Sequence, residues 1–583
     1  MKRKNKKQRK RASEYPMGKP NSDYTDTEST TTLENHLPHK ISSVYKQKKK
    51  ASSSLTFYIV QYPILFFSIG MMIFNLVCYT VARFCVMIAE FVIDGLSRHR
   101  KLRLKLKEAT TYGEWLDIAK RLDEKMGLNK WRNEPNEEYA FDEELLITMS
   151  SRMKNGLQNS DLNSLCNILQ YEVCKQDFAG IEHELLYSRC FSGTKHSIEE
   201  YLSLVDRSLD FVAESSQLSK NEKYAIFKQI SMTYGRTALC LSGGATLTYF
   251  HLGVIKSLLD EKLLPNIVSG TSAGSLMAAM VAVRTDEEIR SEVFVPDFVD
   301  HVRCCHVPLQ TRLKNFYNRG ALFDEELFRQ EALWFCKGNM TFLEAFKKTG
   351  RVLNISVVSN ESHSKLKVLN HINAPQVTIA SAVVASSAVP FVLPPCELKM
   401  KDELGNIVPY YSAGKLWRDG SLVSDIPEKE LNQSFRVKYI IVSQVNPHIS
   451  LFFFSPKGSA GCPPMQRSGR GWRGGFIASS IVQYFLLDLH KWLTFLRDMD
   501  LMPKIMDSNV SNIWLQSFAG NVTILPPNPT IGDLTRLVTD PDKDRLDKFL
   551  ADGQLYTWPK IAMIANRYKN EKKILQLLDR FKN

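Results

Sequence analysis

The feature that most constrains the fold is a pair of strand–turn–helix units in the middle of the chain. Thr237-Ala238-Leu239-Cys240-Leu241 is a short apolar run that ends at Ser242-Gly243-Gly244, and an amphipathic helix pattern follows it. Asn266-Ile267-Val268-Ser269 then leads directly into Gly270-Thr271-Ser272-Ala273-Gly274 and a second helix pattern. Strands that alternate with helices in this way predict an α/β fold with a parallel sheet.

The second turn has the spacing of a nucleophile elbow, Gly270-x-Ser272-x-Gly274. A chain that turns sharply from strand into helix exposes the serine Oγ, and glycines two residues to either side remove side chains that would collide there. Ser272 also precedes a helix N-terminus, which favours a developing negative charge. The motif is common by chance, and its place between a strand and a helix is what favours a nucleophile.

The first turn could supply the complement to that serine. The backbone amides of Gly243 and Gly244 stand at the start of a helix and could bind a carbonyl oxygen as an oxyanion hole. A simple turn between strand and helix remains the alternative.

A serine nucleophile needs a base. The late histidines, His448 in a loop-like context and His490 in an apolar helix, do not stand out as candidates. Trp417-Arg418-Asp419-Gly420-Ser421 does, because an Asp-Gly turn can present a carboxylate directly to the serine hydroxyl. Asp425-Ile426-Pro427 follows closely. The sequence therefore predicts a Ser–Asp dyad in place of a triad.

Taken in order, these motifs resemble the patatin-like phospholipase family. The resemblance rests on Ser242-Gly243-Gly244, Gly270-Thr271-Ser272-Ala273-Gly274 and Asp419-Gly420, with Ala385-Ser386-Ser387-Ala388-Val389-Pro390-Phe391 ahead of the aspartate. Together with its flanks, the chain is similar to the fungal and plant intracellular triacylglycerol lipases of lipid droplets over roughly residues 108–570.

The resemblance implies a three-layer α/β/α sandwich in which Ser272 is the nucleophile and Asp419 the base. It implies that the amides of Gly243, Gly244 and Ala245 hold the oxyanion, and that triacylglycerol is hydrolysed to diacylglycerol and fatty acid through an acyl-enzyme, without metal or cofactor. A phospholipase A or lysophospholipase with the same dyad, or a weakly active or inactive lipid-droplet scaffold, remains an alternative.

The first turn departs from the family pattern. Ala245 stands where a third glycine is usual, Leu247 where many relatives carry Arg or Lys, and Thr248 where a glycine is usual. If the turn requires a positive φ at Ala245, strain of about 1 kcal/mol results. Losing one oxyanion donor would lower the rate by about 10²–10³.

The N-terminal hundred residues point to a lipid surface. Residues 55–93 are mostly apolar, nearly twice the length of about 20 residues that one bilayer span needs. Basic residues flank the segment on both sides, which favours a re-entrant hairpin or an interfacial helix over a single span. A buried soluble helix is the remaining alternative.

Charge supports the same interpretation. Residues 1–107 hold 21 Lys and Arg against 7 Asp and Glu, and residues 108–583 hold 55 of each. The formal charge of +14 therefore surrounds the apolar segment, which favours a membrane surface over nucleic acid. Eleven cysteines with no C-x-x-C spacing argue against a disulfide framework or a zinc ribbon.

Residues 108–235 read as helical, with Thr110 or Thr111 as a cap and Gly127 as a stop for one helix. The apolar run from Phe476 to Leu496 reads as a core helix or a lipid-touching surface. We expect attachment to lipid droplets or the endoplasmic reticulum membrane, with the catalytic part in the cytosol. The expected division is a disordered basic tail at 1–54, a hydrophobic hairpin or span at 55–96, a helical domain at 97–235, a patatin-like catalytic domain at 236–446 and a lipid-facing, helical region at 447–583.

Overall fold

The structure is a computed structural model. It describes residues 55–96, 99–135, 141–361, 365–410, 416–452, 459–463, 477–499, 504–505, 508–509, 515–527 and 530–582. The tail predicted at 1–54 lies outside the described residues, as does most of the Gly/Pro/Arg-rich stretch at 455–475. Residues 55–64 are the first turns of a helix, and residues 65–583 form one compact unit.

The predicted helical region is present, and its helices follow local capping signals. Thr111 caps α4 by accepting the amide of Glu114, and Gly127 ends it in the left-handed conformation, so both predicted signals are confirmed. Ser219 and Glu222 form a capping box at the start of α9. The helical segments ahead of the sheet are α2 (Leu55–Leu96), α3 (Arg100–Glu108), α4 (Tyr112–Met126), α5 (Asn129–Asn133), α6 (Glu143–Gln158), α7 (Leu162–Asn167), η1 (Ile168–Val173), η2 (Phe178–Gly180), η3 (Glu184–Tyr187), α8 (His196–Glu214) and α9 (Lys220–Tyr234).

The α/β prediction is confirmed by a mixed sheet. Its parallel strands, in order across the sheet, are β11 (Val522–Ile524), β8 (Val437–Ser443), β1 (Arg236–Leu241), β2 (Ile267–Gly270) and β3 (Val352–Ser359). Two strands pair antiparallel with β3: β4 (Leu366–Leu369) and β7 (Trp417–Asp419). Two small hairpin-like pairs stand apart: β5 (Lys399–Lys401) with β6 (Ile407–Pro409), and β9 (Lys504–Ile505) with β10 (Ser508–Asn509).

The two faces of the sheet pack against different apolar clusters, as an α/β/α arrangement requires. Leu239 and Leu241 of β1 belong to the large cluster that includes the helices after β1 and β2. Ala238 and Cys240 belong to a second cluster, which Leu431 closes from the helix before β8. This alternation is the period of two that a strand imposes.

The sheet is surrounded by helices that precede, cross and follow it. They are η4 (Ala245–Tyr249), α10 (Phe250–Asp260), α11 (Ala273–Ala282), α12 (Asp286–Glu292), η5 (Pro296–His301), α13 (Leu309–Arg319), α14 (Glu325–Phe335), α15 (Phe342–Thr349), α16 (Ile379–Ser386), η6 (Gly420–Leu422), α17 (Glu428–Phe435), α18 (Pro447–Phe452), α19 (Ile477–Asp498), α21 (Ile531–Thr535), α22 (Lys543–Thr557), η7 (Trp558–Lys560) and α23 (Ile561–Lys582).

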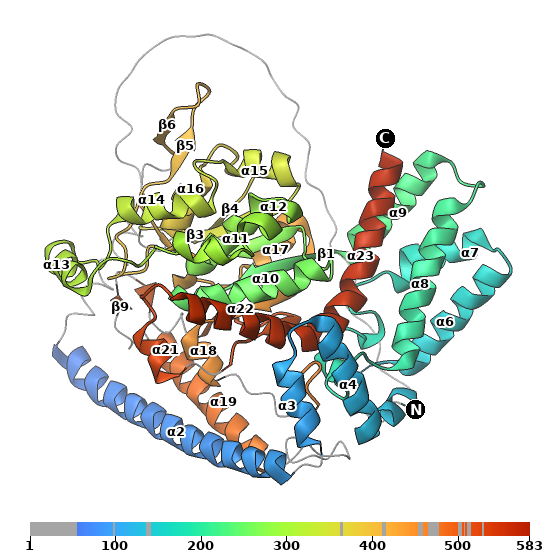
Figure 1. The fold of residues 1–583 in the computed structure, drawn as a ribbon, viewed down its shortest axis with the longest axis horizontal. Coiled ribbons are helices and arrows are strands. Elements are labelled where there is room, and N and C mark those ends of the chain that lie inside the picture. The colour runs from blue at the N-terminus through green and yellow to red at the C-terminus, as the bar shows by residue number, and fades with distance from the viewer. Residues whose placement is uncertain are drawn as a thin grey trace, which may run out of the picture. The chain divides into compact units, whose positions relative to one another are not determined.

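The C-terminal helix joins the helical region to the sheet. α23 packs beside α8 and α9 (Figure 1). The Tyr234 hydroxyl donates to the Arg567 carbonyl at 3.1 Å, and Glu571 accepts the amide of Thr237, in β1, at 2.9 Å. The sequence boundaries expected near 235 and 446 are therefore not breaks in packing, because both sides share one core.

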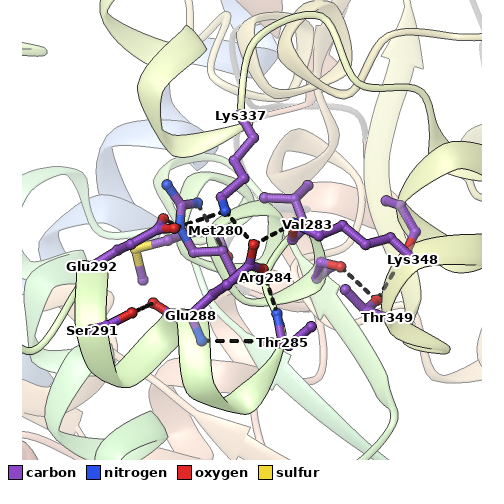
Figure 2. A network of polar contacts seen from close by, with 12 residues as sticks. Met280, Val283, Arg284, Thr285, Glu288, Ser291, Glu292, Lys337, Lys348 and Thr349 are labelled. Carbon is purple, nitrogen blue, oxygen red and sulfur yellow. Dashed lines mark hydrogen bonds and ion pairs between the residues drawn. The ribbon is translucent and has the colours of Figure 1, made fainter.

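An ion-pair network fixes the far end of α11, the helix that follows the elbow (Figure 2). The buried Arg284 guanidinium pairs with Glu292 at 2.8 Å and also donates to the carbonyls of Trp334 and Phe335. Lys337 pairs with Glu288 at 2.7 Å and with Glu292 at 2.8 Å. The network holds the helix from its C-terminal end, while the elbow holds it from the other.

The apolar segment does not form the hairpin that was one of its predicted arrangements, and the interfacial helix and the single span stay predictions. α2 is one continuous helix of 42 residues, with Pro63 inside it. Ser68 and Asn75, one heptad apart, are both buried on one side of this helix. Within the described residues, one helical stretch is long and apolar enough to cross a membrane, Tyr62–Cys85, with a mean hydropathy of 2.1.

Candidate active site

The elbow predicted at Ser272 is present at the end of β2. Ser272 has φ 54° and ψ −135°, a conformation that L-residues rarely adopt outside functional turns. A Cβ on Gly270 would lie 2.5 Å from the Gly274 carbonyl oxygen, and one on Gly274 would lie 2.3 Å from the Leu241 carbonyl oxygen. Gly274 therefore lets the elbow approach the end of β1, which brings the two turns together, and Gly270 lets the helix after the elbow pack against the end of β2.

A second serine fixes the elbow from the opposite side. The Ser272 amide donates to Ser386 Oγ at 3.0 Å, and the Ser386 hydroxyl donates to the Ser356 carbonyl at 2.8 Å. Ser386 ends α16, in the segment that the sequence marked only by resemblance. It connects the nucleophile to β3.

Asp419 reaches the same place by sheet register. Along β3, Ile355 pairs with Gly270 of β2, and Val357 pairs with Asp419 of β7. Val357 also pairs with β4, so β7 must occupy the other edge of β3, the edge that β2 occupies earlier. β7 thus continues the position of β2, and Asp419 comes beside Ser272, two residues beyond the end of that strand.

The carboxyl group of Asp419 is fully buried, and its electrostatics suit proton transfer. Burial raises its pKa from 3.8 to about 6, while the Ser272 hydroxyl and the Ser421 amide and hydroxyl act in the opposite direction. Asp419 Oδ1 accepts the Ser421 amide at 2.8 Å, and Oδ2 has no well-aligned partner among the described residues. The Ser272 hydroxyl therefore lies close to this carboxyl group without an ideal hydrogen bond, as is common before substrate binds.

Gly420 allows the turn after Asp419 to pack on β3. A Cβ at this position would lie 2.6 Å from the backbone of Ser356. Ser356 is also the residue whose carbonyl accepts from Ser386, so Asp419 and Ser272 are both held against the same residue of β3.

The glycine turn after β1 lies beside the serine, but only part of it is available to an oxyanion. A Cβ on Gly243 would lie 2.8 Å from Ser272 Cβ and 3.5 Å from Ser272 Oγ. The Gly243 amide donates to Asp425 Oδ1 at 3.1 Å, so this member of the predicted oxyanion hole already has an acceptor. Among the described residues, no acceptor faces the amides of Gly244 and Ala245.

Ala245 has φ 51°, the conformation that a glycine would adopt more easily. The turn therefore does require a positive φ at Ala245, where the family usually has a glycine, and the strain expected from the sequence is present. An alanine in the left-handed region costs about 1 kcal/mol. Its amide remains a donor at the start of η4.

Asp425 belongs to the site, although no role was predicted for it. Besides the Gly243 amide, it accepts the side-chain amides of Gln444 at 3.3 Å and Asn446 at 2.8 Å through Oδ2. Burial, with a smaller contribution from the neighbouring charge of Asp419, raises its pKa to about 7, while the hydrogen bonds from Gly243, Gln444 and Asn446 act in the opposite direction. The segment Asp425-Ile426-Pro427 was noted after the predicted Asp-Gly turn. Nothing in it indicated that the Asp425 carboxyl group contacts the Gly243 amide of the glycine turn.

Both ring nitrogens of His251, a buried histidine close to the glycine turn, face partners other than Ser272. His251 Nε2 lies 3.1 Å from the Ser242 carbonyl and Nδ1 lies 2.7 Å from Ser443 Oγ, and burial lowers its pKa to about 4. His251 thus anchors the glycine turn as a neutral side chain. Burial also lowers the pKa of His448 to about 4, and His490 is exposed on α19.

A cavity of about 290 Å³ opens beside Ser272 and is mostly apolar. Among its described lining residues, Asp540 is the one that can carry a charge, and burial raises its pKa to about 6. The buried hydroxyls of Thr248 and Ser387 line it and have no hydrogen-bond partner in the described part of the chain. No group of three or more His, Cys, Asp or Glu residues that could hold a metal ion occurs among the described residues.

Comparison with known proteins agrees with this geometry. The family model for patatin-like phospholipase matches residues 239–432, and a model described as a domain of unknown function (DUF3336) matches residues 92–232. A patatin-like phospholipase domain-containing protein of Aspergillus terreus is 41% identical over 547 residues, which cover 91% of this chain and 76% of that protein. The chain belongs to the patatin-like phospholipase family.

Other relatives agree. A patatin-like phospholipase domain-containing protein of Emericella nidulans is 41% identical over 551 residues, covering 92% of this chain and 73% of that protein. A solved structure of ExoU from Pseudomonas aeruginosa with SpcU is 19% identical, covers 27% of this chain and 39% of that chain, and has a TM-score of 0.20, too low to support any inference. Membership of the patatin-like family identifies this protein as a lipid ester hydrolase.

Proposed function

We propose that the protein is a serine lipase that hydrolyses triacylglycerol to diacylglycerol and fatty acid, with Ser272 as nucleophile and Asp419 as base. One observation carries the proposal. Ser272, held at φ 54° on the elbow, lies beside a buried aspartate whose pKa is raised to about 6, at the wall of an apolar cavity. The same cavity wall contains two amides with no acceptor among the described residues.

The reaction follows from these positions. The Ser272 hydroxyl attacks the ester carbonyl as its proton passes to Asp419, and the amides of Gly244 and Ala245 stabilise the oxyanion. Asp419 returns the proton to the departing alkoxide as diacylglycerol leaves. Water then attacks the acyl-enzyme, giving its proton to Asp419, which restores it to Ser272 as the fatty acid leaves. A base with a pKa near 6 is mostly ionised at neutral pH and still exchanges protons readily.

The cavity favours a neutral substrate. No Lys or Arg occurs among its described lining residues, so a phosphate headgroup would find no countercharge, and Asp540 would repel it when ionised. The buried hydroxyls of Thr248 and Ser387 line the cavity without a hydrogen-bond partner among the described residues. By donating to the ester oxygens of a bound substrate, these hydroxyls would regain the free energy that an unpaired buried hydroxyl loses. These features support a triacylglycerol over a phospholipid.

Attachment to a lipid droplet or to the endoplasmic reticulum membrane, with the catalytic part in the cytosol, is part of the proposal. The polar side of α2 faces α19, where Asn75 donates to Asp488 at 2.5 Å and Phe67 meets Trp492 edge to face. The outward side carries exposed apolar residues, including Phe66, Ile73, Phe74, Val77, Val81 and Phe84. A helix on the surface of a soluble protein buries its apolar face and exposes its polar face to water. α2 has the reverse arrangement, which suits contact with lipid.

The test is an assay of the purified full chain on a triolein emulsion and on phosphatidylcholine vesicles, beside Ser272→Ala. We expect wild-type turnover of triolein, less of phosphatidylcholine and none measurable by the variant. A fluorophosphonate probe should label the peptide that contains Ser272. Turnover of phosphatidylcholine with none of triolein would establish the phospholipase alternative. Equal restoration of cellular lipid levels by variant and wild type would establish the scaffold alternative.

Attachment is tested separately by deleting residues 55–96. We expect the shortened protein to leave the floating lipid fraction and to retain hydrolysis of a water-soluble ester. If it still floats with lipid, α2 is not the principal anchor.

A further inference from the structure

Helix α13 exposes its apolar residues, which a helix on the surface of a soluble protein would normally bury. Of its 11 residues, only Arg312 is buried. Leu309 is 68% exposed, Leu313 58%, Phe316 44% and Tyr317 91%. These residues lie at spacings of four, three and one, so they form one stripe along the helix.

The buried arginine holds α13 against the wall of the active-site cavity. Its guanidinium donates to the carbonyls of Val307 at 2.6 Å, Val538 at 2.7 Å and Cys305 at 2.6 Å, and lies 5.0 Å from the centre of the Phe323 ring. Cys305, Phe323 and Val538 all line the cavity of Ser272. The helix is therefore attached by a polar anchor, and its apolar stripe is left for something else.

The stripe continues toward the cavity through Phe391. This residue is about half exposed, has φ 69°, and its ring lies 6.4 Å from that of Phe316. The next residue, Val392, lines the cavity and pairs with Phe323 through the backbone at 3.0 Å. Apolar surface thus runs from the outer stripe to the cavity wall.

The charge around the stripe indicates its partner. Residues 301–323 contain four Lys and Arg and no Asp or Glu. Arg312 is buried, Arg319 pairs with Asp324, and Arg303 and Lys314 are exposed. A short helix with an apolar face and exposed basic residues beside it lies well at the boundary between acyl chains and phosphate headgroups.

We propose that α13 is a docking helix that places the rim of the active-site cavity on a phospholipid-covered lipid surface. Leu309, Leu313, Phe316, Tyr317 and Phe391 enter the acyl-chain boundary, and Arg303 and Lys314 meet the phosphates. Docking at this place lets an insoluble ester pass along apolar surface to Ser272. This role rests on the proposed function, since it delivers substrate to the same site.

The first experiment compares the double variant Leu313→Asp/Tyr317→Asp with the control Ile147→Asp/Tyr171→Asp, whose two apolar residues are 54% and 56% exposed in the helical region. Both are measured as full chains on a dissolved short-chain ester and on a triolein emulsion coated with phosphatidylcholine. We expect the α13 variant to lose at least tenfold on the emulsion and less than twofold on the dissolved ester. The control should change less than twofold on both. Equal emulsion activity of the two variants would overturn the proposal.

The second experiment does not depend on turnover. A photo-crosslinking phenylalanine analogue replaces Tyr317 or, as control, Tyr171 in the full chain, which is mixed with phosphatidylcholine vesicles that contain triolein. We expect crosslinks to lipid from position 317 and not from 171, even if the wild type hydrolyses neither ester and the proposed function fails. In cell extract, a crosslink from 317 to a protein in place of lipid would make the surface a protein-docking site and overturn the proposal.

Discussion

The two turns that meet at the site differ in what their strained residue does. Each holds one non-glycine residue near φ 50°, Ala245 after β1 and Ser272 after β2. At Ser272 the strain exposes the attacking hydroxyl, whereas at Ala245 the side chain is a methyl group and only the amide has a use. The elbow is also fixed through its own amide, by Ser386, while the glycine turn is fixed through Gly243, by Asp425. The strained conformation thus presents a side chain in one turn and a backbone amide in the other, and each turn depends on a distant side chain.

The largest effect should come from removing the base that serves the elbow. We expect Asp419→Asn to lower kcat/KM by about 10⁴, since Asn cannot take the proton of Ser272. In the wild type, kcat/KM should fall tenfold per pH unit below about 6, as Asp419 becomes protonated. A pH–rate profile checks both. A variant that keeps a tenth of the activity would rule out Asp419 as the base.

Stability should respond in the opposite direction to activity. The folded pKa of Asp419 lies above its unfolded value of 3.8, so its contribution to stability is fully present below pH 3.8 and is lost as pH rises through 6. Asp419→Asn carries no such charge, and we expect it to have the higher Tm at pH 8. The difference in Tm should shrink at pH 4, and thermal melts at the two values measure it.

A smaller loss of activity is expected from changing Asp425, the residue that holds the glycine turn. Asp425→Ala removes the acceptor of the Gly243 amide, so the amides of Gly244 and Ala245 should lose their alignment and kcat should fall by about 10–10². Asp425→Asn retains an oxygen for that amide and should stay within about fivefold of wild type. If both variants match wild type in kcat while KM is unchanged, Asp425 does not position the turn.

The corresponding change at the elbow is Ser386→Ala, which leaves the Ser272 amide without its acceptor. We expect kcat to fall by about tenfold and the rate of fluorophosphonate labelling to fall with it. Ser381→Ala makes the same substitution at another buried serine of α16 and should alter stability without altering the labelling rate. Equal labelling by the two variants would show that Ser386 acts only on stability.

The smallest effect should come from replacing Ala245 by glycine, which adopts the same left-handed conformation without strain. Ala245→Gly should change kcat by less than threefold and stability by less than about 1 kcal/mol, because relief of the left-handed conformation is offset by the added freedom of the unfolded chain. Ala245→Val keeps the amide but disfavours φ 51° further, and should lower kcat by at least tenfold. Equal activity of Gly and Val variants would show that this amide does not contribute.

The features that could be predicted from the sequence are those formed by residues close together along the chain. The strand order around the elbow, the caps at Thr111 and Gly127 and the helix-rich region before the sheet all follow from local signals, and the structure contains them. The sequence could not show that the Gly243 amide is taken by a carboxyl group 182 residues away, because no local pattern encodes that contact. The sequence could not distinguish a hairpin from the continuous helix α2 for a related reason, since Asn75 of α2 donates to Asp488 of α19, far along the chain.

The register of β3 has a consequence for how this enzyme can vary. Ser272 and Asp419 are both positioned from the same edge of one strand, so their separation is set by the rise between Ile355 and Val357 and not by the chain that links β3 to β7. The link between β5 and β6, residues 402–406, belongs to that intervening chain but contributes neither the Ser386 contact nor the cavity lining, so this link can lengthen, shorten or change its partners. New contacts for regulation or substrate selection can therefore accumulate there while the two reacting groups keep their spacing.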